Sequence, residues 1–149
     1  MRQEENLAAR SEMGCPMSLV RLLPAWFHAV ADYAVAALLI VVPLVAGGSA
    51  TAVATGVVVG AVVALVSMLT RYPLGVVKIL PFTVHSGGDY VAVALLVAGP
   101  FALGFAGSGL AVFYLVAGLA VLAVSLVTNY QYSPRRAAGL PSQPIHTRV

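Results

Sequence analysis

Residues 23–33 read LPAWFHAVADY, and residues 80–90 read LPFTVHSGGDY. Both stretches follow the pattern L-P-x-x-x-H-x-x-x-D-Y, and both open a long apolar run. The spacing of 57 residues matches His28 with His85 and Asp32 with Asp89. Residues four apart lie on one face of a helix. The sequence therefore predicts two copies of one helical unit, each carrying a His and an Asp side by side.

The composition places these copies in a membrane. The chain of 149 residues is 60% hydrophobic and 9% charged, whereas a soluble domain has about 25% charged residues. The uncharged runs are long enough for helices of about 20 residues that cross a lipid bilayer. The net charge is +3, but the sequence contains no stripe of basic residues interleaved with aromatic ones. We therefore expect no binding of nucleic acid.

We predict an all-α fold, a four-helix transmembrane bundle built from two tandem helical-hairpin repeats. The predicted spans are residues 24–45, 51–70, 81–103 and 110–128. They form one domain over residues 21–130, with repeat 1 over 21–72 and repeat 2 over 78–130. Residues 1–20 are predicted to form an N-terminal tail, and residues 131–149 a disordered C-terminal tail whose polar composition cannot bury a core.

The positive charges predict the orientation. Residues 46–51 and 104–109, the loops inside the two hairpins, contain no Lys or Arg, whereas the middle loop carries Arg71 and Lys78 and both tails carry arginines. Positively charged segments stay in the cytoplasm. We therefore expect both termini and the middle loop to be cytoplasmic in a multi-pass protein of the cell inner (plasma) membrane.

The two His/Asp pairs are predicted to meet. In an up-down-up-down bundle the first and third helices are diagonal neighbours, and two hairpins inserted the same way up are related by a pseudo-two-fold axis along the membrane normal. An Asp inside the hydrocarbon costs about 2.5–3.5 kcal/mol, so both should face the bundle interior. We expect one shared cluster near the cytoplasmic side, rimmed by hydroxyl groups. The cluster residues are His28, Asp32, His85 and Asp89, and the rim residues are Ser67, Thr70, Ser125 and Thr128.

Three functions are compatible with such a cluster. It could pin the helices together in a structural or accessory subunit of a larger membrane complex or homo-oligomer. It could bind haem b or a divalent metal through His28 and His85, because imidazole and carboxylate groups suit such ligands. It could also relay protons or ions. Enzymatic sequence signatures are absent from the chain, so we expect a small non-enzymatic integral membrane protein.

Aromatic residues gather near the predicted cytoplasmic interface. They are Trp26, Phe27, Tyr72, Phe82 and Tyr130. Because aromatic side chains prefer the membrane–water interface, we interpret them as anchors.

The H-x-x-x-D-Y repeats, with the apolar run at residues 95–105, resemble the small bacterial four-span membrane proteins called SPW-repeat proteins. Those proteins carry an S-P-W motif late in their odd-numbered helices. Here Pro43 lies between Val42 and Leu44, and Pro100 lies between Gly99 and Phe101. The resemblance implies a four-span, two-repeat protein of the bacterial inner membrane, and it implies no reaction.

Overall fold

The computed structural model describes residues 22–130 of the chain. The predicted tails at residues 1–20 and 131–149 lie outside the described residues, so their predictions stay untested.

Four long helices make up most of the described part. They are α2 (Ala25–Ala46), α3 (Ala50–Leu69), α4 (Phe82–Ala102) and α5 (Gly109–Val127). Each is 19 to 22 residues long and apolar enough to cross a membrane. Every helix end lies within one residue of its predicted position. The all-α class and the four membrane-crossing helices are thus confirmed.

The helix ends follow local sequence signals. Pro24 and Pro81 directly precede α2 and α4, where a missing backbone N–H loses no hydrogen bond. Ser49 caps α3, and its hydroxyl accepts the N–H of Ala52 at 3.2 Å. Gly47 and Gly104 follow α2 and α4 with φ angles of 68° and 74°, a region that glycine enters at no steric cost.

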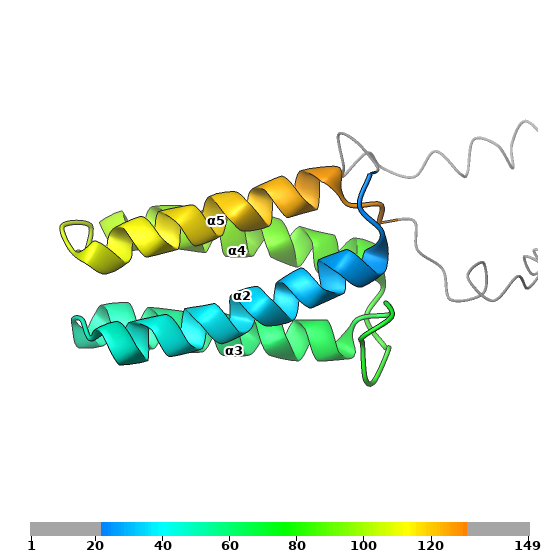
Figure 1. Ribbon diagram of the computed structural model, residues 1–149, viewed down its shortest axis with the longest axis horizontal. Helices are drawn as coiled ribbons and strands as arrows, with labels where there is room; N and C mark the ends of the chain where they lie inside the picture. The colour runs from blue at the N-terminus through cyan, green and yellow to red at the C-terminus, as the bar shows by residue number, and fades with distance from the viewer. Residues whose placement is uncertain (1–21, 131–149) are drawn as a thin grey trace, which may run out of the picture.

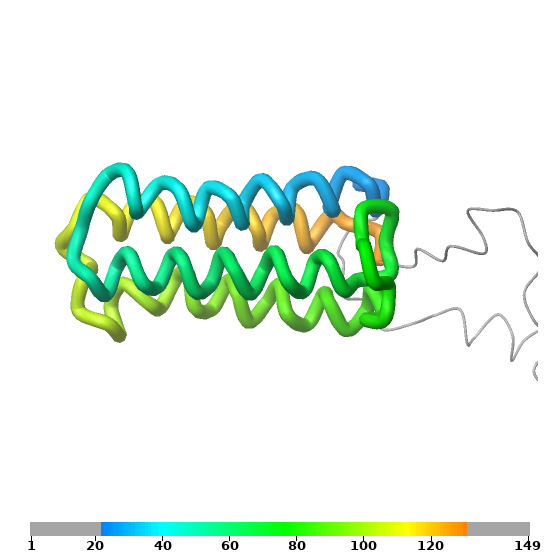
Figure 2. Tube along the Cα trace, turned by 90° about the horizontal axis from the view of Figure 1, so that it is seen from below, coloured from blue at the N-terminus to red at the C-terminus, as the bar shows by residue number. Residues whose placement is uncertain are grey.

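The helices pack as two hairpins. The pair α2 and α3 forms one hairpin and the pair α4 and α5 the other, while α2 also contacts α5 and α3 also contacts α4. Helices α2 and α4 are therefore diagonal neighbours. Figures 1 and 2 show the loops inside both hairpins at one end of the bundle. The first and last described residues and the middle loop lie at the other end, as the repeat predicted.

Short backbone pairings close the bundle at this second end. Leu80, just before α4, pairs with Thr70 at the end of α3, and Leu23, just before α2, pairs with Thr128 at the end of α5. The amide of Leu80 donates to the carbonyl of Leu69 at 2.8 Å, and the amide of Leu23 donates to that of Val127 at 3.0 Å. Each threonine is thereby held beside the first turns of a His-bearing helix.

Close backbone approach holds the first hairpin. A Cβ atom added to Gly56 of α3 would collide with the backbone oxygen of Leu39 and would lie 2.7 Å from the ring of Pro43, both in α2. It would also lie 2.5 Å from the hydroxyl oxygen of Tyr114 in α5. Small residues let membrane helices pack this closely.

We expect Gly56→Ala to destabilise the bundle by about 1–3 kcal/mol, because the new methyl group overpacks the interface between α2 and α3. Reversible unfolding in mixed detergent micelles measures the free energy of unfolding. Gly99→Ala in α4 is the matched control, since a Cβ there meets no atom of the described residues within 4 Å. Equal stability of the two variants would contradict the close approach.

Candidate functional site

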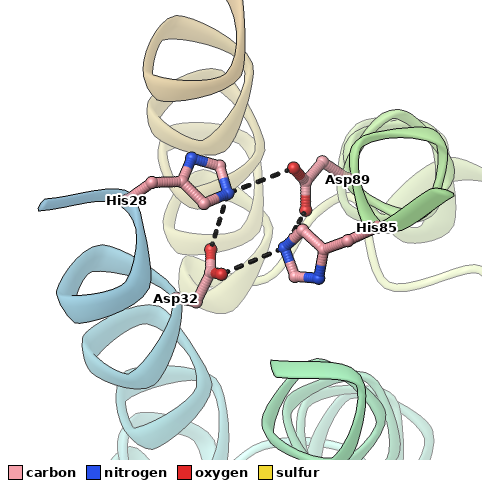
Figure 3. A group of neighbouring side chains, drawn as sticks. All are labelled: His28, Asp32, His85 and Asp89. Atoms are coloured by element: carbon pink, nitrogen blue, oxygen red, sulfur yellow. Dashed lines mark ion pairs between the residues drawn. The ribbon is translucent and has the colours of Figure 1, made fainter. Parts of the chain in front are cut away.

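The two His/Asp pairs meet across the bundle. Figure 3 shows His28 and Asp32 from α2 facing His85 and Asp89 from α4. The two histidines are 1% and 2% exposed, and each aspartate is 8% exposed. The predicted buried, pseudo-symmetric cluster of these four residues is confirmed.

Each imidazole faces both carboxylates through its Nε2 atom. His28 Nε2 lies 3.4 Å from Asp32 Oδ1 and 3.3 Å from Asp89 Oδ2. His85 Nε2 lies 3.0 Å from Asp32 Oδ2 and 3.3 Å from Asp89 Oδ1. The four side chains therefore form a ring in which every carboxylate bridges two imidazoles from different hairpins (Figure 3).

Two threonines fix the orientation of the imidazoles. The hydroxyl of Thr70 donates its one hydrogen to the carbonyl of Val66 at 2.7 Å, and it lies 2.9 Å from His85 Nδ1. It must accept at this second contact, so His85 Nδ1 carries a hydrogen. Thr128 repeats the arrangement, with 2.6 Å to the carbonyl of Val124 and 2.9 Å to His28 Nδ1.

The contacts at Nδ1 leave Nε2 as the ring nitrogen that points into the cluster. When Nδ1 of a neutral imidazole is protonated, Nε2 carries a free lone pair. Both Nε2 atoms are buried, and neither has a hydrogen-bond partner among the described residues, although carboxylate oxygens lie close by. Each Nε2 therefore points into the space between the two carboxylates, where a neutral imidazole offers its lone pair.

Hydroxyl groups surround the carboxylates. Asp32 Oδ2 accepts from Tyr72 at 3.2 Å and from Ser67 at 3.4 Å. Asp89 Oδ2 accepts from Tyr130 at 2.9 Å and from Ser125 at 3.4 Å. The structure thus places all four predicted rim hydroxyls against the cluster, with the threonines on the histidines and the serines on the aspartates.

Three of the aromatic residues that we interpreted as anchors at the membrane interface are instead buried inside the bundle. Tyr72, Phe82 and Tyr130 are buried, and they cover the cluster at the end of the bundle that holds the middle loop. The rings of Phe82 and Tyr130 lie 4.7 Å apart, and Phe82 also packs on His28 at 5.4 Å. The anchor interpretation is wrong for these three because the polar cluster beneath them needs a cover that excludes water. Trp26 and Phe27 are exposed, as expected of anchors.

Tyr72 and Tyr130 are site residues that the sequence analysis missed. Burial raises the pKa of both phenols, so they remain hydrogen-bond donors to the aspartates. They occupy matching places in the two repeats. Both positions hold a tyrosine, and this match between the repeats is the signal that could have assigned the two residues to the cluster.

The opposite side of the cluster is apolar. Leu39 and Leu96 are almost fully buried and follow Asp32 and Asp89 by seven residues, about 10 Å along the helices. They belong to a core that also contains Phe105, Leu110 and Tyr114. The cluster is therefore closed by aromatic residues at one end and by aliphatic residues at the other.

Tyr72→Phe and Tyr130→Phe should each destabilise the bundle by about 1–3 kcal/mol, because a buried carboxylate loses a donor that water cannot replace. Unfolding in mixed micelles checks this. Tyr33→Phe is the control, since the Tyr33 hydroxyl makes an exposed bond to the carbonyl of Leu74. A similar small effect for all three variants would contradict the assigned role of the buried tyrosines.

Searches of protein-family models, of curated proteins and of solved structures found no match to this chain. Of the resemblance to SPW-repeat proteins, the structure supports the four membrane-crossing helices in a hairpin arrangement.

Proposed function

We propose that the His/Asp cluster binds one divalent cation, Zn²⁺ by the type of its ligands, and that the cation joins the two hairpins of a non-enzymatic membrane protein. One observation carries the proposal. Two buried Nε2 atoms, oriented by Thr70 and Thr128, point between two carboxylates without a hydrogen-bond partner among residues 22–130.

The dimensions of the cluster fit this cation. Zn²⁺ takes imidazole nitrogen and carboxylate oxygen at about 2.0–2.2 Å in tetrahedral sites. Ligand atoms on such a tetrahedron are about 3.3–3.6 Å apart. Each Nε2 here lies 3.0 to 3.4 Å from one oxygen of each carboxylate, and the two imidazoles contact different oxygens of each carboxylate. One ligand atom from each side chain can be chosen so that all four lie within 4.8 Å of one another. Four protein ligands are typical of structural rather than catalytic sites.

The charge of the cluster also favours a cation. Two carboxylates with two neutral imidazoles carry two negative charges in an apolar bundle, and a divalent ion balances them. The competing arrangement is a network of two imidazolium ions and two carboxylates. It would direct each Nε2 hydrogen at one oxygen, whereas each Nε2 lies between one oxygen of Asp32 and one of Asp89, at 3.3 and 3.4 Å for His28 and at 3.0 and 3.3 Å for His85.

The two other ligands or activities considered for the cluster have less support. Haem b held between His28 and His85 would need the space beside the Nε2 atoms, and Asp32 and Asp89 stand there. Proton or ion transport would need a polar route beyond the cluster, and the apolar core around Leu39 and Leu96 lies on that side.

The exposed apolar side chains of all four helices support contact with a lipid bilayer. Association with a larger complex or a second copy of the chain stays a prediction. We further propose that the end of the bundle with the middle loop, and with it the cluster, faces the cytoplasm of a bacterial inner membrane. The arginine and lysine residues of that loop support this orientation.

We expect the purified, tag-free chain to bind about one Zn²⁺ per molecule after dialysis against metal buffer. Inductively coupled plasma mass spectrometry gives the stoichiometry, and competition with a chromophoric chelator gives the affinity. His28→Ala and His85→Ala should each abolish binding, because each removes a ligand that the other three side chains cannot replace.

Thr70→Val tests the same site without removing a ligand. It should weaken Zn²⁺ binding by about 10–100-fold, the usual effect of losing the partner that orients a ligating histidine. Thr55→Val is the matched control, because the Thr55 hydroxyl bonds to the carbonyl of Thr51 in its own helix. A folded protein that takes up no Zn²⁺, Mn²⁺, Fe²⁺ or Co²⁺ would refute the proposal.

The orientation is tested with single cysteines in a Cys15→Ser background. Gly107→Cys in the loop of the second hairpin should react with a membrane-impermeant maleimide in intact cells. Leu74→Cys in the middle loop should react only after permeabilisation. Both positions are exposed, so the reverse labelling pattern would show that the cluster lies near the outer face.

A further inference from the structure

The two repeats are unequal beside the cluster. A cavity of about 280 Å³ lies between α3 and α4 and reaches His85 and Asp89. Its pseudo-symmetric counterpart between α2 and α5 reaches His28 and Asp32 and has a volume of about 40 Å³. Of these two cavities beside the cluster, the one between α3 and α4 is therefore much the larger.

Two substitutions between the repeats contribute to the difference. Gly88 and Ala92 line the large cavity, whereas Ala31 and Val35 line the small one at the matching positions. A Cβ atom added to Gly88 would meet nothing within 4 Å among the described residues. Close packing thus does not require this glycine, although glycine costs about 1 kcal/mol relative to alanine inside a helix. What the glycine provides is space beside Asp89.

The cavity continues along the whole seam between α3 and α4. A second cavity, of about 790 Å³, shares Val58, Val59 and Leu95 with the first and extends to Ala50 and Leu103 at the other end of the bundle. From residue 50 to residue 66 the groove follows about 24 Å of helix. Volumes of about 300–1,000 Å³ are usual for ligand sites.

The groove is apolar along its length and polar where it meets the cluster. Apart from His85 and Asp89, the lining of the inner cavity is valine, alanine, leucine and glycine. Val58, Val62, Val91 and Leu95 along it are more than half exposed, so the groove opens sideways toward lipid. A long hydrocarbon chain matches the groove in shape and polarity.

The chemistry at the inner end selects the head group. A carboxylate such as Asp89 only accepts hydrogen bonds, so the head must donate one, and a carboxylate or phosphate head would be repelled. Asp89 already faces both imidazoles. With the divalent cation of the proposed function balancing the two carboxylates, an ammonium head would lose its hydration without a free counter-charge, whereas a hydroxyl costs much less to bury.

We propose that the groove between α3 and α4 binds a neutral, single-chain lipophilic alcohol, with its hydroxyl donating to Asp89 and its chain lying along the valines of α3. The choice of a neutral head group rests on the proposed cation, and a carboxylate that binds a metal through one oxygen still accepts a hydrogen bond on the other.

Photolabelling of the full chain in phosphatidylcholine nanodiscs tests this. The probe is hexadecanol with a diazirine in its chain, and peptide mass spectrometry locates the labels. We expect labels at the α3–α4 seam, near Val62 and Leu95, and few at the α2–α5 seam near Val35. Excess hexadecanol should compete, whereas palmitate and hexadecyl methyl ether should not.

Paired variants exchange the two cavity walls. Gly88→Ala with Ala92→Val gives α4 the residues of α2, and it should lower labelling of the α3–α4 seam about tenfold by filling the cavity. The reciprocal pair, Ala31→Gly with Val35→Ala, should raise labelling of the α2–α5 seam. Both use residues that the fold already accepts in the other repeat, and Zn²⁺ content reports separately on the cluster.

Three results would overturn the proposal. The first is equal labelling of both seams in the unmodified protein. The second is competition by the methyl ether as strong as by the alcohol, which would mean that the groove takes any hydrocarbon chain. The third is unchanged labelling in the variant with Gly88→Ala and Ala92→Val.

Discussion

Ionisable groups inside a membrane must find their partners within the protein, and this constraint organises the bundle. Each aspartate costs about 2.5–3.5 kcal/mol to insert, and the fold answers with contacts from both imidazoles, a serine and a tyrosine. The imidazoles in turn need acceptors, which the threonines supply. The threonines are held in place by the backbone pairings at the helix ends. The helix positions, the backbone pairings and the aromatic cover thus all position or bury the residues of one polar cluster.

The repeat makes this centre a joint product of both hairpins. Thr70 belongs to the first repeat and orients His85 of the second, while Thr128 of the second repeat orients His28 of the first. Each carboxylate likewise bridges imidazoles from both repeats. A single hairpin therefore contains a His, an Asp and a Thr but no complete site. Bringing two copies together creates the fourfold donor set and couples the cluster to assembly of the bundle.

The two repeats match at the cluster but differ in the helix walls beside it. The cluster keeps the pseudo-two-fold symmetry because its contacts are reciprocal, and changing one member leaves a buried polar group without a partner. The walls beside it are free to differ, because Gly88 and Ala92 touch the cavity rather than the ring of ion pairs. The second repeat thus combines its share of the symmetric centre with a larger cavity than the first repeat has.

The sequence alone determined the spans, their ends within one residue and the pairing of His with Asp. Apolar runs, helix-breaking glycines and the repeat spacing are local signals that the bilayer constraint makes strong. It also predicted the convergence, because two equivalent helices in a four-helix bundle lie diagonally. The sequence did not reveal that Tyr72, Phe82 and Tyr130 turn inward, since an aromatic residue near a membrane interface is equally suited to face lipid. Only the tertiary structure decided the orientation of the imidazoles and the unequal cavities, because both depend on distances between helices that no single helix encodes.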